Sequence, residues 1–246
     1  YDVGLFSRNN GKIANAGILD SYFYGTSKVG GVCGNNYTGT ITNCYNTGSV
    51  SGTGVNVGGV IGRNESNATI KNCYYDSTIY TGTAIGYLAD TEDENGGKTT
   101  AQFASGEVAY LLSQGCTIGE VTYDGTIWGQ TIGTDTYPTL GGAKVYKNAT
   151  YKGCEGKPGE PVSYEYSNTE KNTYGDHPDA DNDGRCDNCS AIIDGIGAKL
   201  AGYSLSLTGN IGVNFYMELS DDIVKDESAY LNFTLPNGTT SRVYVS

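Results

Sequence analysis

The sequence predicts a mainly β protein: a short β-solenoid (β-helix-like) repeat region with a small helical cap, then a linker and an antiparallel β-sandwich-like module. The chain has 37 Gly and 21 Tyr in 246 residues but a single Met and a single Trp, a composition typical of strands and turns. A unit of about 28 residues recurs between residues 3 and 80. Near the C-terminus apolar and polar residues alternate, as they do in strands with one buried face.

The repeat is visible in three successive stretches of the chain, Val3–Ala16, Val29–Val50 and Val57–Ile79. Two sets of residues fall at matching positions: Gly4, Gly31 and Gly59, and Ile13, Ile41 and Ile70. We expect the matched isoleucines to stack inward, and the matched glycines to form tight corners that other residues would strain. An unordered, low-complexity Gly/Asn segment is the alternative.

Neighbouring positions of the repeat give three further expectations. Asn43 and Asn72 should form a side-chain ladder between adjacent repeats. Cys44 and Cys73 should stack as small buried apolar groups. Beside the matched isoleucines, Thr42 and Lys71 should point to solvent.

The segments NCYNTGSVSG at Asn43–Gly52 and GGVIGRN at Gly58–Asn64 resemble the GLUG repeat family, which is found in bacterial surface proteins. The resemblance covers about a third of the chain, and the first unit departs from it by carrying Ala16 where the others have Cys. The resemblance implies display outside the cell and no particular reaction.

The chain divides into four predicted segments. Residues 1–88 hold the repeats, 89–150 a capping and closing segment, 151–192 a linker poor in aliphatic residues, and 193–246 a partial antiparallel β module. In the second segment we expect a helix that caps the open end of the solenoid, with Ser105 as N-cap, an apolar face of Val108, Leu111 and Leu112, and a stop at Gly115. Trp128 should be a packing anchor rather than a ligand platform. In the last segment, two strands should pair around Asn237-Gly238.

The segment DADNDGRCDNC has the spacing of a calcium loop. Carboxylates at alternate positions and one backbone carbonyl supply the hard oxygens that Ca²⁺ prefers. The predicted ligands are Asp179, Asp181, Asp183, the Arg185 carbonyl and Asp187. Ser190 stands where an EF-hand has a bidentate Glu, so a calcium-binding Asp repeat is favoured over an EF-hand, and a solvated acidic turn is the alternative.

Four zinc ligands lie in the same part of the chain: the pair Cys186 and Cys189, with His177 and Cys154 upstream. A Cys₃His set is sound zinc chemistry, but its irregular spacing is a weaker signal than two C-x-x-C pairs. Calcium is therefore the favoured cofactor and zinc the second, with a disulfide or free thiols as further alternatives.

The charge and the motifs exclude several functions. A net charge of −12 with only 15 scattered Lys and Arg argues against binding nucleic acid, and no 18-residue apolar run predicts membrane insertion. Because His177 is the only histidine, a Ser-His-Asp or Cys-His mechanism would have to pass through it. We therefore expect no enzyme but a secreted or cell-surface scaffold or adhesion protein that presents its modules to a host protein or glycan. The alternative is a non-catalytic flank of a large secreted peptidase or carbohydrate-active enzyme.

Overall fold

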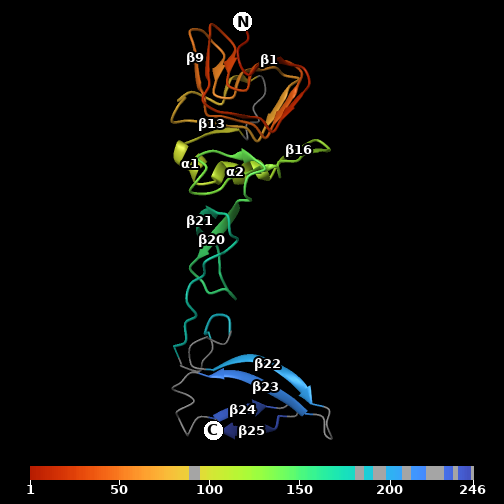
Figure 1. Ribbon diagram of the computed structural model, residues 1–246, viewed down its shortest axis with the longest axis vertical. Helices are drawn as coiled ribbons and strands as arrows, with labels where there is room; N and C mark the ends of the chain where they lie inside the picture. Colours follow the sequence, from red (N-terminus) through yellow and green to blue (C-terminus); the bar gives the residue numbers. More distant parts are fainter. Residues whose placement is uncertain are drawn as a thin grey trace. The chain divides into compact units, whose positions relative to one another are not determined.

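The computed structural model describes residues 1–88, 95–180, 186–190, 198–206, 212–219, 230–234 and 238–244. The chain forms two compact units, Tyr1–Thr150 with Pro161–Thr173, and Tyr151–Glu160 with Tyr174–Ser246. The described residues are mainly β, as predicted, with two short helices in the first unit (Figure 1). Each of the two units combines two separate stretches of the chain, so the units do not correspond one to one to the four predicted segments. The boundaries of those segments stay a prediction.

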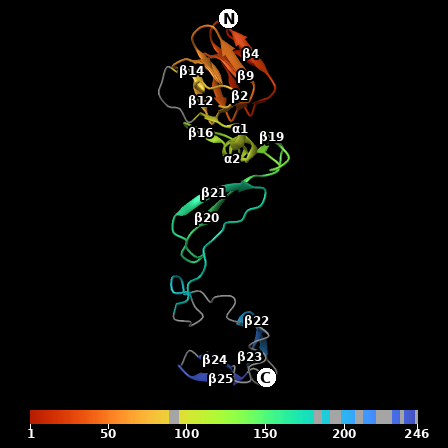
Figure 2. The same cartoon turned by 90° about the vertical axis from the view of Figure 1, so that its left-hand side faces the viewer.

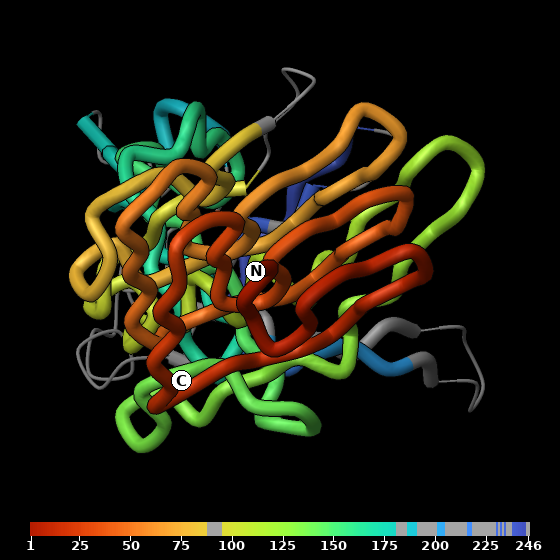
Figure 3. The backbone as a smooth tube through the Cα atoms, turned by 90° about the horizontal axis from the view of Figure 1, so that it is seen from above, coloured from red at the N-terminus to blue at the C-terminus, as the bar shows by residue number. Residues whose placement is uncertain are grey.

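Residues 1–88 and 95–98 contain short parallel strands, each of which pairs with the matching strand of the next repeat (Figure 3). One sheet has the order β1 (Phe6–Asn9), β6 (Cys33–Asn36), β11 (Ile61–Asn64), β14 (Ile85–Leu88). A second has the order β2 (Lys12–Ala14), β7 (Thr40–Thr42), β12 (Thr69–Lys71). A third has the order β3 (Gly17–Ile18), β8 (Tyr45–Asn46), β13 (Tyr74–Asp76), β15 (Gly96–Lys98). Two pairs complete the region, β4 (Tyr22–Gly25) with β9 (Ser49–Gly52) and β5 (Val29–Gly30) with β10 (Val57–Gly58) (Figure 2).

The matched isoleucines form an apolar column. Ile41 pairs directly with Ile13 on one side and with Ile70 on the other, and the three side chains are 0%, 8% and 6% exposed. The predicted inward stacking is thus confirmed, and Cys44 and Cys73 are buried in the same core as expected.

The expectation that Thr42 points to solvent is wrong, because this side of the repeats is covered by a later part of the chain. Thr42 is fully buried, while Lys71, its neighbour in register, is half-buried. Beside Thr42, Asn43 Nδ2 donates to the carbonyls of Tyr123 and Asp124 at 3.2 and 3.3 Å. The outward face of β7 is therefore covered at Thr42 and stays partly accessible at Thr40.

Asparagine side chains connect successive repeats. Asn72 Nδ2 donates to Asn43 Oδ1 at 2.9 Å, which confirms the predicted ladder. A second ladder, which the sequence did not predict, runs from Asn9 Nδ2 to Asn36 Oδ1 at 2.9 Å and from Asn36 Nδ2 to Asn64 Oδ1 at 2.8 Å. Because these buried amides satisfy each other, they link the repeats without leaving polar groups unpaired.

The matched glycines lie at bends between strands, as predicted: Gly31 between β5 and β6, and Gly59 between β10 and β11. The left-handed conformation occurs at asparagines, with φ of 56°, 53° and 54° at the matched Asn15, Asn43 and Asn72 and of 64° at Asn56. The matched glycines have no positive φ. A side chain at these bends would be strained by close contact: a Cβ on Gly31 would lie 2.2 Å from Asn46 Cγ, and one on Gly59 would lie 2.4 Å from Tyr75 Cγ.

Replacing Asn36 with Leu should destabilise the first unit by about 2–4 kcal/mol, since the buried Asn64 Oδ1 would lose its donor and the ladder bond from Asn9 Nδ2 would also be lost. The free energy of unfolding from urea denaturation measures this effect. The exposed Asn10→Leu is the matched control and should change it little. Equal losses for the two variants would mean that the ladder does not stabilise the repeats.

The predicted helical segment forms two helices, α1 (Thr100–Ala104) and α2 (Glu107–Ser113). The N-cap of α1 is Thr99, which forms a capping box with Gln102. Ser105 is the C-cap of α1, so the prediction that it is an N-cap is wrong. Gly115, with φ of 63°, follows α2 as expected. Neither described helix is long enough to cross a membrane.

The helices pack against the side of the repeats and not over their end. Phe103, Val108 and Leu112 form one apolar cluster with Tyr45 and Tyr74, which come from two different repeats, and with Trp128. Leu111 is only partly buried at the rim of this cluster. An end cap would contact a single repeat, so the predicted position of the helix is wrong.

Three strand pairs complete the first unit and lead out of it. They are β16 (Cys116–Ile118) with β17 (Val121–Tyr123), β18 (Trp128–Gly129) with β19 (Thr139–Leu140), and β20 (Tyr146–Tyr151) with β21 (Pro161–Ser167) (Figure 2). Trp128 is 3% exposed, and its Nε1–H donates to the Asn43 carbonyl at 3.0 Å. It is therefore the packing anchor that the sequence predicts.

The described residues from 198 onward form two antiparallel pairs, β22 (Ala198–Ser206) with β23 (Gly212–Leu219), and β24 (Tyr230–Thr234) with β25 (Thr240–Tyr244). The second pair is the predicted hairpin, and Gly238 in its turn has φ of 82°. Asn237 lies outside the described residues. The sandwich-like arrangement of these strands stays a prediction.

Candidate metal centre

The second unit brings together four side chains that bind transition metals. One ligand atom from each of Cys154, His177, Cys186 and Cys189 lies within 4.8 Å of all the others. Cys186 Sγ is 3.7 Å from Cys154 Sγ, and Cys189 Sγ is 3.5 Å from His177 Nδ1. These are the four residues that the sequence offers as a Cys₃His set.

Two turns present the sulfur atoms. In the first, the Lys157 N–H donates to the Cys154 carbonyl at 2.9 Å, and in the second the Ser190 N–H donates to the Cys186 carbonyl at 2.7 Å. Backbone N–H groups also point at the sulfurs, from Lys157 to Cys154 and from Asn188 and Cys189 to Cys186. Each turn therefore holds its cysteine with the sulfur on the inside.

Further contacts hold the two segments side by side. The rings of Tyr151 and Tyr174 stack with centroids 5.2 Å apart, and the Gly175 N–H donates to the Gly153 carbonyl at 3.0 Å. Gly156 leaves room for the second turn, since a Cβ there would lie 2.8 Å from the Cys189 Cβ and 3.0 Å from its sulfur. A glycine two residues after Cys154 is the sequence signal that could have favoured this Cys₃His set as a metal site.

The thiols of the cluster differ in acidity. Burial raises the pKa of Cys186, but hydrogen bonds from the His177 side chain and from the backbone N–H groups of Cys189 and Asn188 lower it overall to about 6. Burial, together with hydrogen bonds to Cys189 and Cys186, raises the pKa of Cys154. At neutral pH the cluster therefore contains a thiolate, the form that binds metal.

The predicted calcium ligands are described only in part. Asp181, Asp183 and Arg185 lie outside the described residues. Asp187 is exposed, and its Oδ2 accepts a hydrogen bond from the Ala180 N–H at 2.9 Å, while Asp179 is half-buried. The calcium loop stays a prediction.

The repeats of the first unit match a known family. The GLUG motif fits residues 25–51 and 53–80. These two repeats are GLUG repeats. The stretch before them lies outside the match, yet its strands β1 to β4 pair in parallel with those of the first GLUG repeat. No curated protein and no solved structure matches the chain.

The GLUG repeats contain three cysteines of their own, but these are core residues. Cys33, Cys44 and Cys73 are fully buried. Burial raises the pKa of Cys33 to about 11 and that of Cys73 well above its ordinary value. For Cys33 and Cys73, burial therefore favours the protonated thiol over the thiolate that binds metal.

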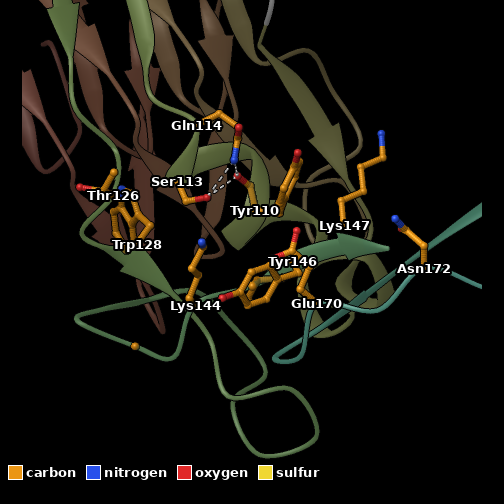
Figure 4. A pocket seen from close by; sticks show the side chains of 12 residues that line it. Tyr110, Ser113, Gln114, Thr126, Trp128, Lys144, Tyr146, Lys147, Glu170 and Asn172 are labelled. Atoms are coloured by element: carbon orange, nitrogen blue, oxygen red, sulfur yellow. Dashed lines mark hydrogen bonds between the residues drawn. The ribbon is translucent and has the colours of Figure 1, made fainter. Parts of the chain in front are cut away.

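Near the GLUG repeats, the first unit has an open hollow of about 680 Å³ between α2, β18 and β20 (Figure 4). Its lining combines aromatic rings with charged and amide groups, among them Tyr110, Tyr146, Lys144, Glu170 and Asn172. Lys144 Nζ lies 4.4 Å from the centroid of the Tyr146 ring. The sequence did not predict these residues as a site, because they belong to no motif and meet only in the folded unit.

Proposed function

We propose that this chain is a non-catalytic scaffold of the bacterial cell surface, in which the GLUG repeats stack into a short β-solenoid. The observation that carries the proposal is the direct pairing of Ile13, Ile41 and Ile70 in successive repeats. Strands that stack in this way build an extendable support, because each repeat contacts only its neighbours. The resemblance to repeats of bacterial surface proteins supports placement outside the cell.

We further propose that the first unit presents the hollow between α2, β18 and β20 to a glycan on a host surface. Tyr110 and Tyr146 offer aromatic faces, which pack against the apolar face of a sugar ring. Glu170 and Asn172, which are both exposed, offer polar groups for its hydroxyls. A host protein is the other partner class, and calcium on the Asp179–Asp187 segment is proposed from its spacing alone.

A glycan array should show binding by the intact chain, and Tyr146→Ala should weaken that binding about tenfold, because the variant removes an aromatic face of the hollow. Tyr24→Ala is the matched control, since Tyr24 is 55% exposed on β4, outside the hollow. It should bind like the parent chain.

The same preparation, incubated with the bound glycans and with peptide and ester substrates, should give no turnover. Binding that is unaffected by Tyr146→Ala, or weakened equally by Tyr24→Ala, would contradict the role of the hollow. Glycan cleavage that disappears on a single Asp or Glu substitution would contradict the non-catalytic function.

A further inference from the structure

We propose that Cys154, His177, Cys186 and Cys189 together bind one zinc ion, which joins residues 151–160 to residues 174–190 as a structural site. The proposal goes beyond the scaffold function, since it concerns the second unit and needs neither GLUG repeat nor glycan. The sequence leaves zinc binding, a disulfide and free thiols open for these cysteines, and the proposal selects zinc binding.

The distances are those of a tetrahedral zinc site. With Zn–S of about 2.3 Å and Zn–N of about 2.0–2.1 Å, a tetrahedron places two sulfurs about 3.8 Å apart and a sulfur and a nitrogen about 3.5 Å apart. The observed separations are 3.7 Å between Cys186 and Cys154 and 3.5 Å between Cys189 and His177. Ligand atoms within 4.8 Å of one another leave room for a single ion and not for an iron–sulfur cluster.

The same distance argues against a disulfide. An S–S bond measures about 2.03–2.05 Å, so sulfurs that are 3.7 Å apart in Cys154 and Cys186 are not bonded. Soft thiolates with one imidazole select zinc among the common divalent ions, whereas calcium requires oxygen ligands. The calcium prediction therefore concerns other residues than this cluster.

A metal ion would supply what this part of the chain lacks. Among the described residues from 151 to 190, only Cys154 and Cys186 are buried, each with 1% exposure. A segment without an apolar core needs a disulfide or a metal to hold one conformation. Four protein ligands fill a tetrahedral zinc ion and leave no open position, so the site is structural and not catalytic.

The test is the metal content of the purified, reduced full-length chain, together with X-ray absorption at the zinc edge. We expect about one zinc per chain, with three sulfur and one nitrogen neighbour at about 2.3 and 2.0–2.1 Å. Chelation of the metal should expose residues 151–190 to proteolysis, while the thermal unfolding of the first unit stays unchanged.

Matched variants distinguish the proposed zinc ligands from a cysteine outside the cluster. Cys189→Ser and His177→Ala should reduce the zinc content to near zero, because each removes one of four ligands. Cys116→Ser, which changes a half-buried cysteine of β16 outside the cluster, should keep the full content. Gly156→Val should also weaken zinc binding, as its side chain would displace the Cys189 sulfur.

The X-ray absorption spectrum counts the sulfur neighbours of the zinc ion directly, so the test does not depend on folding alone. Cobalt bound in place of zinc should give the visible absorption of a tetrahedral thiolate site in the parent chain. Zinc well below one per chain, full zinc in Cys189→Ser, or a Cys154–Cys186 disulfide in the native protein would overturn the proposal. Protection of residues 151–190 by calcium but not by zinc would overturn it as well.

Discussion

Ile41→Asp should unfold the GLUG repeats. Ile41 is fully buried between Ile13 and Ile70, so the new carboxylate would lie in an apolar column without a partner. Burying an unpaired charge costs on the order of 4–5 kcal/mol or more, a large part of the roughly 5–15 kcal/mol that stabilises a typical domain. We expect the β signal in circular dichroism to be largely lost at room temperature, or the urea midpoint to fall steeply.

Thr40→Asp is the control for Ile41→Asp. Thr40 precedes Ile41 in the same strand β7, but its side chain is only half-buried on the opposite face. The same charge should therefore cost less than about 1 kcal/mol there, because water still reaches it. Similar unfolding curves for the two variants would show that the isoleucine column is not the core of the repeats.

Trp128→Ala should destabilise the first unit by about 3–5 kcal/mol, the usual cost of removing a large buried aromatic side chain. The Trp128 ring lies 5.4 Å from the Tyr45 ring, centroid to centroid, in the cluster that joins the helices to the side of the repeats. Because Trp128 is the only tryptophan, unfolding must be followed by circular dichroism and not by its fluorescence.

Trp128→Phe separates packing from hydrogen bonding. Phenylalanine keeps a ring in the cluster but leaves the buried Asn43 carbonyl without the Nε1–H donor, which should cost about 1–3 kcal/mol. We therefore expect Trp128→Phe to fall between the parent chain and Trp128→Ala. A loss below about 1 kcal/mol for Trp128→Ala would mean that the helical segment is not anchored by this residue.

Two parts of the chain are stabilised in different ways. The first unit buries an apolar column and satisfied asparagine ladders, such as Asn36 between Asn9 and Asn64. The described residues between 151 and 190 have almost no buried side chains, and we propose that the four clustered metal ligands take the place of a core there. Removing metal and mutating Ile41 should consequently affect different units.

The repeats were predictable because their signal is periodic and local. Matching Ile, Asn and Cys residues recur at a fixed spacing, and parallel stacking brings equal positions into contact. The sequence alone therefore predicted the mainly β class, the isoleucine column, the ladder between Asn43 and Asn72, and the hairpin at Gly238.

Several details depended on contacts between distant parts of the chain. The burial of Thr42 depends on cover near Tyr123, and the helices pack on the side of the repeats because Phe103 meets Tyr45, 5.7 Å away between ring centroids. Spacing cannot reveal either contact. The spacing also does not predict the left-handed backbone at Asn43 and Asn72, since both Asn and Gly tolerate that conformation.

For the metal ligands, too, the sequence decided one part and the tertiary structure another. The sequence by itself identified three members of the Cys₃His set, because the chain has one histidine and one C-x-x-C pair, and it offered Cys154 as the fourth without a spacing that fixes it. Only the tertiary structure decided that Cys154 joins them, since it lies on the other side of β21 in the sequence and no local spacing connects it to Cys186. A ligand set assembled from two segments is a property of the fold, whose turns place the sulfurs within bonding reach of one ion.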